Sequence, residues 1–595
     1  MASILLRSRL GAGGMILIVC VAARSYADER TPADLLPQST MAFLEMSHPG
    51  EFLSIVEQHG LAKRLLNLEP VQAAMQKNEY LVFRGVLALI EVQMEMPWRE
   101  IVRRGLGGGL AIAFDKKTGG VVLLAKATDG STHAKFAEVL ANLVTLDARN
   151  KAKAPPIDVS QYRKQKVYSA EHLWVATVDD WVVATNHREL HDQIIDRILD
   201  ESQGSLAEDL QFNKARQAAD PTKAVWSYVN IAAVRDAGLA SQAFAERTEN
   251  PLAEILLGGL VSTLRQTPYI TVDFAVRDDG IEVTASAPHD RGWAGDLREH
   301  YFGPQGLGEA PPHLIVNDAI LSIGAYRDIS AMWLRAGELL DEQANEKLAK
   351  ADSDLSTLFA GKDFGEDVLG AFAPAFRLVL TRQTFAEGQP APAIKLPAFA
   401  LTAELKDSAA SQPELRRTFQ SLVGFFNIVG AMNGQPQLDL TTEKTAGIEL
   451  VTASHVEDKT APDPAKLRIN YNFSPSIAFA DSRFVLASTK ELAVALATAR
   501  ALKSAPEEVS HVANSRAELR FDALREALAD NREHLVAQNM LEKGNSRAVA
   551  NQEIEVLLNV PQWFDRLELQ LDTTPRLMQA SANLVLRPVD QRDQE

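Results

Sequence analysis

The sequence predicts an α+β fold made of two tandem similar domains, each with antiparallel sheet covered by helices. Three observations lead to this prediction. Short apolar strands joined by turn residues outnumber plausible parallel crossovers, which favours antiparallel sheets. Segments of the second half repeat segments of the first half in the same order. The chain has 595 residues, 46% hydrophobic and 23% charged, which is ordinary for a globular protein and enough for two large domains.

The clearest repeat is a strand that leads into a helix. Residues 179–190 share their layout with residues 481–492, about three hundred positions later. Weaker matches keep the same order: Phe136 with Phe419, Val229–Ala237 with Leu519–Ala527, and Ala285–Ala287 with Ala580–Ala582. The alternative is that such short matches between segments occur in any α+β chain, without a duplication. A duplication predicts a first domain at 28–288, a linker at 289–312 and a second domain at 313–590.

Within the first half, residues 36–46 alternate like a half-buried strand, and Pro49 opens an amphipathic helix. A second helical region is expected from 70 to 104. Turn residues then join successive apolar runs, which predicts hairpins. The expected strands are 110–114 with 121–124, 174–178 with 181–184, 226–231 alone, and 270–276 with 281–285.

The second half begins with a strand at 318–323 that parallels the first strand of the chain. A strand at 399–405 follows, and then a helix with apolar residues at Phe419, Leu422 and Phe426. The proline-rich segment Gln389–Pro397 interrupts this hairpin and explains part of the drift in spacing between the copies.

The N-terminus predicts an export signal at residues 1–27. Arg7 and Arg9 precede an apolar run at 15–23, and Ser25-Tyr-Ala27 provides the small residues that a signal peptidase needs. An uncleaved anchor is the alternative, but nine apolar residues are too few to span a layer of about 30 Å. A lipid anchor on Cys20 is disfavoured because Ile18 and Val19 precede it. We therefore expect a periplasmic or extracellular protein with no transmembrane segment in the mature chain.

Charge and cysteine content exclude several classes of partner and site. The net charge is −17, which repels nucleic acid and anionic lipid surfaces. Cys20 is the only cysteine and lies in the predicted signal, so disulfides, thiolate metal sites and a thiol nucleophile are excluded from the mature chain. No cofactor is expected.

The most tempting chemistry lies at His187-Arg-Glu-Leu-His191. Histidines at i and i+4 share a helix face and can bind a metal together with Glu189. The zinc-protease pattern requires Glu directly after the first His, which is absent here. The second copy has Thr489 and Ala493 in place of the histidines. The alternative is that Asn186 with Glu189, and Ser488 with Glu491, form capping boxes.

Other motifs have a structural explanation beside the functional one. Gly105–Gly109 precedes a strand, whereas a phosphate-binding loop follows one. Asp179-Asp180 and Asp278-Asp279 offer paired carboxylates but lie at predicted turns, where Asp is favoured. No Gly-x-Ser-x-Gly motif occurs. Four strand aromatics either line a ligand groove or fill a core: Trp174, Trp181, Trp226 and Tyr228.

Several of these features together resemble an uncharacterised family of exported bacterial proteins. They are the signal, the Leu36-Pro-Gln-Ser-Thr40 strand, the helix from Pro49, the Glu69–Ala73 segment, and Ser205–Asp209 before Phe212. Ser205–Asp209 has no convincing counterpart in the second half. The resemblance implies export and a structural domain, and it assigns no active site.

The sequence therefore favours a non-enzymatic scaffold or binding protein of the cell envelope, whose ligand or protein partner is unknown. One alternative is a hydrolase of envelope polymers, with its site in one copy or between the copies. Another is a chaperone or carrier for apolar ligands, which needs an open apolar groove.

Overall fold

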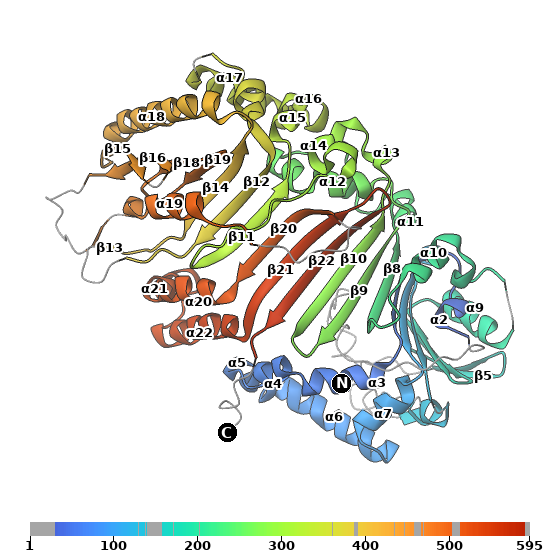
Figure 1. Ribbon diagram of the computed structural model, residues 1–595. Coiled ribbons are helices and arrows are strands. Elements are labelled where there is room, and N and C mark those ends of the chain that lie inside the picture. Colours follow the sequence, from blue (N-terminus) through green and yellow to red (C-terminus); the bar gives the residue numbers. More distant parts are fainter. Residues whose placement is uncertain are drawn as a thin grey trace. The chain divides into compact units, whose positions relative to one another are not determined.

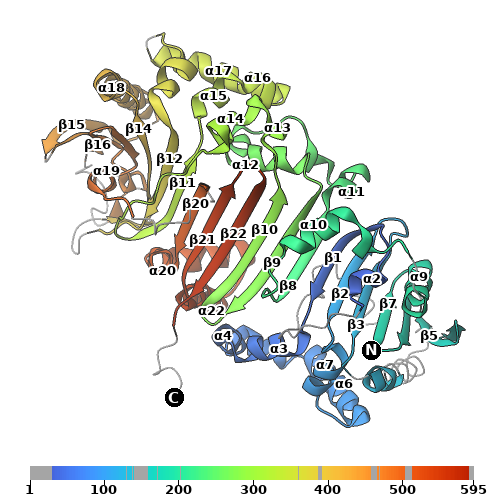
Figure 2. The same cartoon turned by 45° about the vertical axis from the view of Figure 1, so that its right-hand side comes forward.

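The computed structural model describes residues 30–588 apart from 129, 137, 140–157, 171, 201–202, 360, 386–390, 434, 446, 457–465, 468 and 503–511. The export signal lies outside these residues. The described chain falls into two compact units. Unit 1 contains the described residues of 30–240 and 267–287, and unit 2 those of 241–266 and 288–588. Figures 1 and 2 show both.

Unit 1 has one antiparallel sheet. Its strands are β1 (Thr40–Met46), β2 (Leu110–Asp115), β3 (Val121–Lys126), β4 (Asp158–Tyr162), β5 (Gln165–Ala170), β6 (Leu173–Val178), β7 (Trp181–Thr185), β8 (Val225–Asn230), β9 (Tyr269–Arg277) and β10 (Gly280–Pro288). Neighbours follow the order β10-β9-β8-β1-β2-β3-β7-β6-β5-β4.

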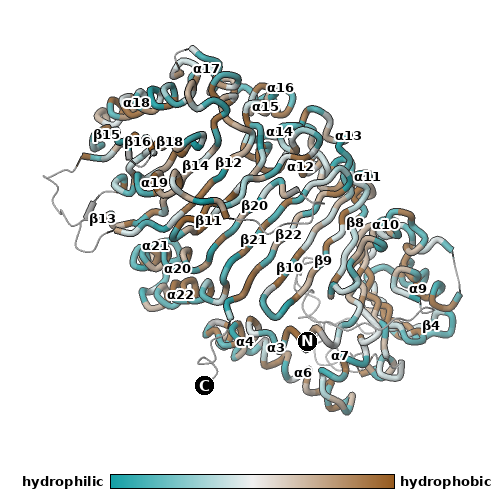
Figure 3. Tube along the Cα trace, viewed as in Figure 1, coloured by the Kyte–Doolittle hydropathy of each residue, from teal (hydrophilic) through white to brown (hydrophobic). Residues whose placement is uncertain are grey.

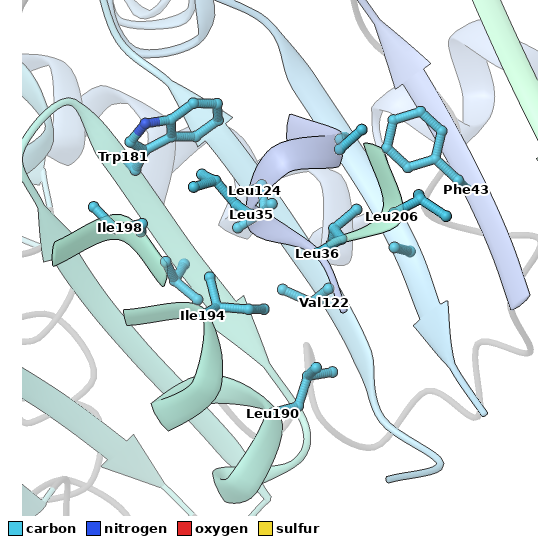
Figure 4. Packing of buried hydrophobic residues seen from close by; sticks show 14 of the residues in the cluster. Leu35, Leu36, Phe43, Val122, Leu124, Trp181, Leu190, Ile194, Ile198 and Leu206 are labelled. Carbon is cyan, nitrogen blue, oxygen red and sulfur yellow. The ribbon is translucent and has the colours of Figure 1, made fainter. Parts of the chain in front are cut away.

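The main core of unit 1 lies between this sheet and three helices. Alternate strand residues such as Val122 and Leu124 point toward the helices, as the two-residue period of a strand requires. Figure 4 shows Leu190, Ile194 and Ile198 turned toward this core. The unit's helices are α2 (Pro32–Leu35), α3 (Pro49–Gln58), α4 (Gly60–Leu66), α5 (Glu69–Met75), α6 (Asn78–Met94), α7 (Trp98–Leu106), α9 (Arg188–Leu199), α10 (Leu210–Ala218) and α11 (Ile231–Asp236), of which α2, α9 and α10 cover the core.

The sheet of unit 2 is also antiparallel. Its strands are β11 (Ala319–Tyr326), β12 (Phe372–Thr381), β14 (Ala398–Leu405), β15 (Leu438–Thr445), β16 (Ile448–His455), β18 (Ser476–Ala480), β19 (Arg483–Ala487), β20 (Val512–Arg520), β21 (Phe564–Thr573) and β22 (Leu577–Leu586). Two short strands, β13 (Ala391–Pro392) and β17 (Lys466–Leu467), pair with each other. Neighbours in the sheet follow the order β22-β21-β20-β11-β12-β14-β19-β18-β16-β15. Counted from the first strand of each unit, the two orders are the same.

Helices of unit 2 gather at both ends and on both faces of its sheet (Figures 1 and 2). One face packs Leu450, Ala478 and Val485 against α19, and the other packs the adjacent Val451 and Ile477 against α18. The helices are α12 (Pro251–Leu264), α13 (Arg291–Ala294), α14 (Glu299–Phe302), α15 (Ile329–Leu334), α16 (Ala336–Leu339), α17 (Glu342–Leu358), α18 (Ser408–Met432), α19 (Lys490–Thr498), α20 (Phe521–Ala529), α21 (Arg532–Lys543) and α22 (Arg547–Asn559). A strand buried on both faces needs apolar residues at successive positions, and β16 and β18 have them at Leu450-Val451 and Ile477-Ala478.

The predicted α+β class with antiparallel sheet is confirmed. The predicted helix from Pro49 is broken at His59, whose backbone is extended and whose ring accepts a hydrogen bond from the amide of Leu61. The sequence did not indicate β4 and β5, because the side chains of β4 are mostly polar and exposed and so show no apolar alternation. The predicted domain bounds stay a prediction.

Residues 289–312, predicted as a linker, contain the short helices α13 and α14. Arg298, Tyr301 and Phe302 in this segment are buried. In the part of the chain that the structure describes, no helix is both long and apolar enough to cross a bilayer.

Candidate functional site

The candidate metal ligands His187, Glu189 and His191 lie at the start of α9 but do not converge. His191 is fully buried, and its Nδ1 lies 3.1 Å from the carboxylate of its neighbour Asp192. Glu189 is exposed and accepts a hydrogen bond of 3.1 Å from Gln193. Among the described residues, no group of three or more His, Cys, Asp or Glu side chains is placed to hold a metal ion.

His191 therefore has a packing role between α9 and the sheet. Burial lowers the pKa of its imidazole, and the hydrogen bond to Asp192 opposes this effect only in part. Its Nε2 is buried and has no hydrogen-bond partner among the described residues. A neutral ring is the form that such a site favours. On α19 of unit 2, Ala493 is buried in the equivalent place.

The predicted capping boxes do not form. The N-cap residue of α9 is His187 and that of α19 is Thr489, whose hydroxyl accepts a hydrogen bond from the amide of Leu492 at 3.3 Å. Asn186 and Ser488 lie one residue earlier and bind neighbouring strands instead. A true capping box occurs where none was predicted, between Ser205 and Glu208.

The remaining sequence motifs have structural positions. Asp179-Asp180 and Asp278-Asp279 form the turns between β6 and β7 and between β9 and β10. The glycines from Gly105 end α7 and lead into β2. A side chain at Gly107 would overlap the carbonyl oxygen of Arg103, so that turn requires glycine.

The strand aromatics fill a core. Trp226 and Tyr228 are buried against Phe212, with ring centroids 5.6 Å and 5.2 Å away and edge-to-face geometry. Trp181 is buried in the same core, and Trp174 packs against it from its edge.

Unit 2 contains a groove of about 770 Å³ beside α19, a size typical of small-molecule sites. Its lining comes from the chain before β11, the end of β12 and the connection after it, the start of β14, residues 471–474, and the exposed side of α19 with the two residues that follow it. No sequence motif indicates this site, although the repeat comparison names Thr489 and Glu491 in its lining. The lining also includes Asn317, Arg382, Thr384, Ala495 and Arg500.

Hydrogen bonds hold the groove walls in place. Asn472 is buried, donates to the carbonyl oxygens of Ile394 at 2.8 Å and Ile469 at 2.7 Å, and accepts from the amide of Leu396 at 2.9 Å. Gln383 donates to the carbonyl oxygen of Leu396 at 2.7 Å. The side-chain amides of Asn472 and Gln383 are already hydrogen-bonded to backbone groups of the protein. A ligand would therefore contact the other lining side chains.

Three charged side chains line the groove, Arg382, Glu491 and Arg500, and the charge of Arg382 is neutralised by neighbouring acids. Arg382 makes two hydrogen bonds to Asp530, at 2.7 Å and 3.1 Å, and one to Glu526 at 2.5 Å. The bonds to Asp530 raise the pKa of the guanidinium, so it stays charged but engaged. Hydroxyl, amide and small apolar groups dominate what is left, a composition that suits an uncharged polar ligand.

A smaller hollow of about 370 Å³ lies at the equivalent place in unit 1, between the segment before β1 and α9. Its lining includes Lys117, Asp196 and Arg197. On α19, Thr498 and Ala499 take the places that Asp196 and Arg197 have on α9. The two units therefore differ in charge and in the volume of the hollow at this place.

Comparison with known proteins finds no family model and no curated protein sequence that matches the chain. Among solved structures, crystal forms I, III and IV of TP0453 are partly similar, with 12%, 12% and 11% sequence identity. The alignments cover 45%, 44% and 48% of this chain and 81%, 80% and 88% of that one, with TM-scores of 0.23, 0.23 and 0.24. A likeness this low supports no inference about function.

Proposed function

We propose that this chain is an exported, non-enzymatic binding protein of the cell envelope, and that the groove beside α19 holds its ligand. The observation that carries the proposal is the groove itself, which has a volume of about 770 Å³, has walls held by hydrogen-bonded amide side chains, and is lined mostly by uncharged side chains. A ligand with hydroxyl or amide groups and no net charge fits this lining.

The distribution of titratable groups supports binding over catalysis. General acid-base catalysis needs a proton donor and acceptor within hydrogen-bond reach of one reacting group. In the groove, Glu491 is exposed in the first turn of α19, and Arg382 is held by Asp530 and Glu526. An envelope hydrolase is the second candidate function. Glu491 is the residue to test for it, because it is the carboxylate named above in the groove.

We also propose that the two units arose by duplication. The identical order of strand neighbours supports this, and so do two matched details. Asn186 and Ser488 make equivalent bonds to the strands beside them, and Asp179 and Asp481 both have left-handed backbone conformations at equivalent turns. A duplicated chain can keep the fold in both copies while only one keeps an open binding groove.

The ligand proposal is tested by filling the groove. Ala495 lies on its α19 wall, so A495W removes space without changing charge. Protein purified from its own envelope is examined by native mass spectrometry. We expect a small bound molecule on the wild type and on the matched control L541S, which lies on α21, and none on A495W. An empty wild type, or equal loading of A495W, would contradict the proposal.

The enzymatic alternative has its own experiment. Purified protein is incubated with envelope polymers, and the release of soluble fragments is measured. We expect no release. Release by the wild type that is lost in E491Q would establish the hydrolase instead.

Export is tested by N-terminal sequencing of envelope material, which should begin near Asp28.

A further inference from the structure

The helix α12 of unit 2 packs against its core through the partly buried Ile255 and Leu260, but its fully buried positions are not apolar. Its buried residues are polar or glycine: Glu254, Gly258, Gly259, Ser262 and Thr263. Its exposed leucines are Leu252, Leu256 and Leu257, with 66%, 54% and 49% of their surface accessible. An ordinary surface helix has the opposite arrangement, with its apolar stripe toward the core. Figure 3 shows where this apolar helix lies in the fold.

A buried ion pair fixes the rotation of α12 about its axis. Glu254 is fully buried and accepts two hydrogen bonds from Arg298, at 3.0 Å and 3.1 Å. Thr248 donates a further short hydrogen bond to the same carboxylate. Exposing Glu254 by turning the helix would leave Arg298 buried without its partner, which is strongly unfavourable. The leucines therefore cannot exchange places with the polar face.

The rest of the buried face of α12 is also held by hydrogen bonds and close contacts with neighbouring side chains. Thr263 is hydrogen-bonded to His289 at 3.0 Å, and Tyr301 donates to the carbonyl oxygen of Leu256 at 3.1 Å. A side chain at Gly259 would overlap the ring of Tyr301, and one at Gly258 would overlap the Glu254 carboxylate. Glycine in the middle of a helix costs about 1 kcal/mol, so these two are explained by the close approach that they allow.

The exposed face of α12 is too small for a stable protein interface by itself. At about 1.5 Å per residue the helix is about 21 Å long, and a face about 10 Å wide offers on the order of 200 Å². Stable interfaces bury roughly 800 Å² on each partner. A lipid surface has no such minimum, because it is fluid and needs no matching shape. The same length is too short to cross a layer of about 30 Å, so contact would be in the plane of the surface.

Charge decides the kind of lipid. The chain carries a net charge of −17, which repels anionic headgroups. The only charged residue within α12 is Glu254, and it is buried and paired. Attraction must therefore come from apolar contact. We propose that α12 docks this protein on a zwitterionic membrane surface by inserting Leu252, Leu256 and Leu257 among the acyl chains. The proposal does not depend on the groove beside α19.

The test is sedimentation of the mature chain, which begins near Asp28, with phosphatidylcholine vesicles. We expect binding that is insensitive to salt and weaker when anionic lipid is added. The variant L252S/L256S/L257S should bind about 100-fold less tightly or worse, as expected for removing three leucines from an apolar layer. The matched control L541S removes an exposed leucine from α21, 86% accessible, and should bind like the wild type.

A second measurement reports the contact directly. In the mature chain, which has no cysteine, L256C carries the only thiol and is labelled with an environment-sensitive dye. Its emission should shift to the blue on adding vesicles, whereas a label at K347C on α17 should not respond. Wild-type protein that ignores vesicles, or a triple serine variant that binds them equally well, would overturn the proposal. So would leucine-dependent dimers in sedimentation equilibrium without vesicle binding, since a second copy would then cover α12.

Discussion

The side-chain oxygen of Asn186 accepts a hydrogen bond of 2.7 Å from the backbone amide of Val121. Val121 begins β3, and Asn186 follows β7, the neighbour of β3 in the sheet. In unit 2, the hydroxyl of Ser488 accepts a bond of 2.9 Å from the amide of Phe399, at the equivalent junction of β14 and β19. In both units the side chain of the residue that joins the strand to the helix also accepts a hydrogen bond from a backbone amide near the start of the adjacent strand.

This relationship predicts similar losses from N186A and S488A. Each change leaves one strand amide without its side-chain acceptor, which should lower the free energy of unfolding by about 1 kcal/mol. Urea unfolding measures the loss. K214C, an exposed change on α10, is the control and should have no effect. A clear loss in only one of the two variants would show that the junctions are not equivalent.

The turns at Asp179 and Asp481 have backbone φ angles of 51° and 54°. This left-handed region suits glycine and tolerates Asp, but a β-branched residue is strained there. We expect D179G and D481G to match the wild type in stability, and D179V and D481V to lose about 1–2 kcal/mol. Thermal unfolding of the four variants measures this. Valine and glycine variants of equal stability would contradict it.

The pair of Glu254 and Arg298 predicts an asymmetric response to mutation. R298M leaves a buried carboxylate without its cation and should cost about 3–5 kcal/mol. The double variant E254Q/R298M removes the orphaned charge and should recover much of that loss. Urea unfolding of both proteins decides the question, and a double variant no more stable than R298M would argue against a buried charge as the cause.

His191 predicts a pH dependence. Burial lowers the pKa of its imidazole, so the unfolded chain binds a proton more readily than the folded one. The neutral His191 ring contributes to the stability of the folded protein above the pKa of an unfolded histidine, about 6.5. This contribution is lost as the pH falls through the lower pKa of His191 in the folded protein. The midpoint of thermal unfolding should therefore fall more steeply between pH 7 and pH 5 in the wild type than in H191L. Parallel curves would exclude this role.

Local patterns determined much of the fold. Apolar alternation located β1, because a strand with one buried face must alternate, and apolar runs joined by turn residues located β2 and β3. Turn residues located the hairpins around Asp179 and Asp278, because Asp side chains can hydrogen-bond to nearby backbone in a turn and, as at Asp179, tolerate a left-handed conformation. The order of matching segments predicted a duplication, which stays a prediction; the strand neighbours of the two units follow one order.

The tertiary structure decided what the side chains do. Asn186 has the sequence signature of a helix cap, yet a strand distant in sequence takes its hydrogen bond, because an unpaired strand amide competes for the same oxygen. The groove beside α19 combines segments separated by more than a hundred residues, which no local pattern reveals. In α12 the sequence shows only an apolar helix. Which side is buried depends on Arg298, whose distant charge can be neutralised inside the fold only if Glu254 faces inward.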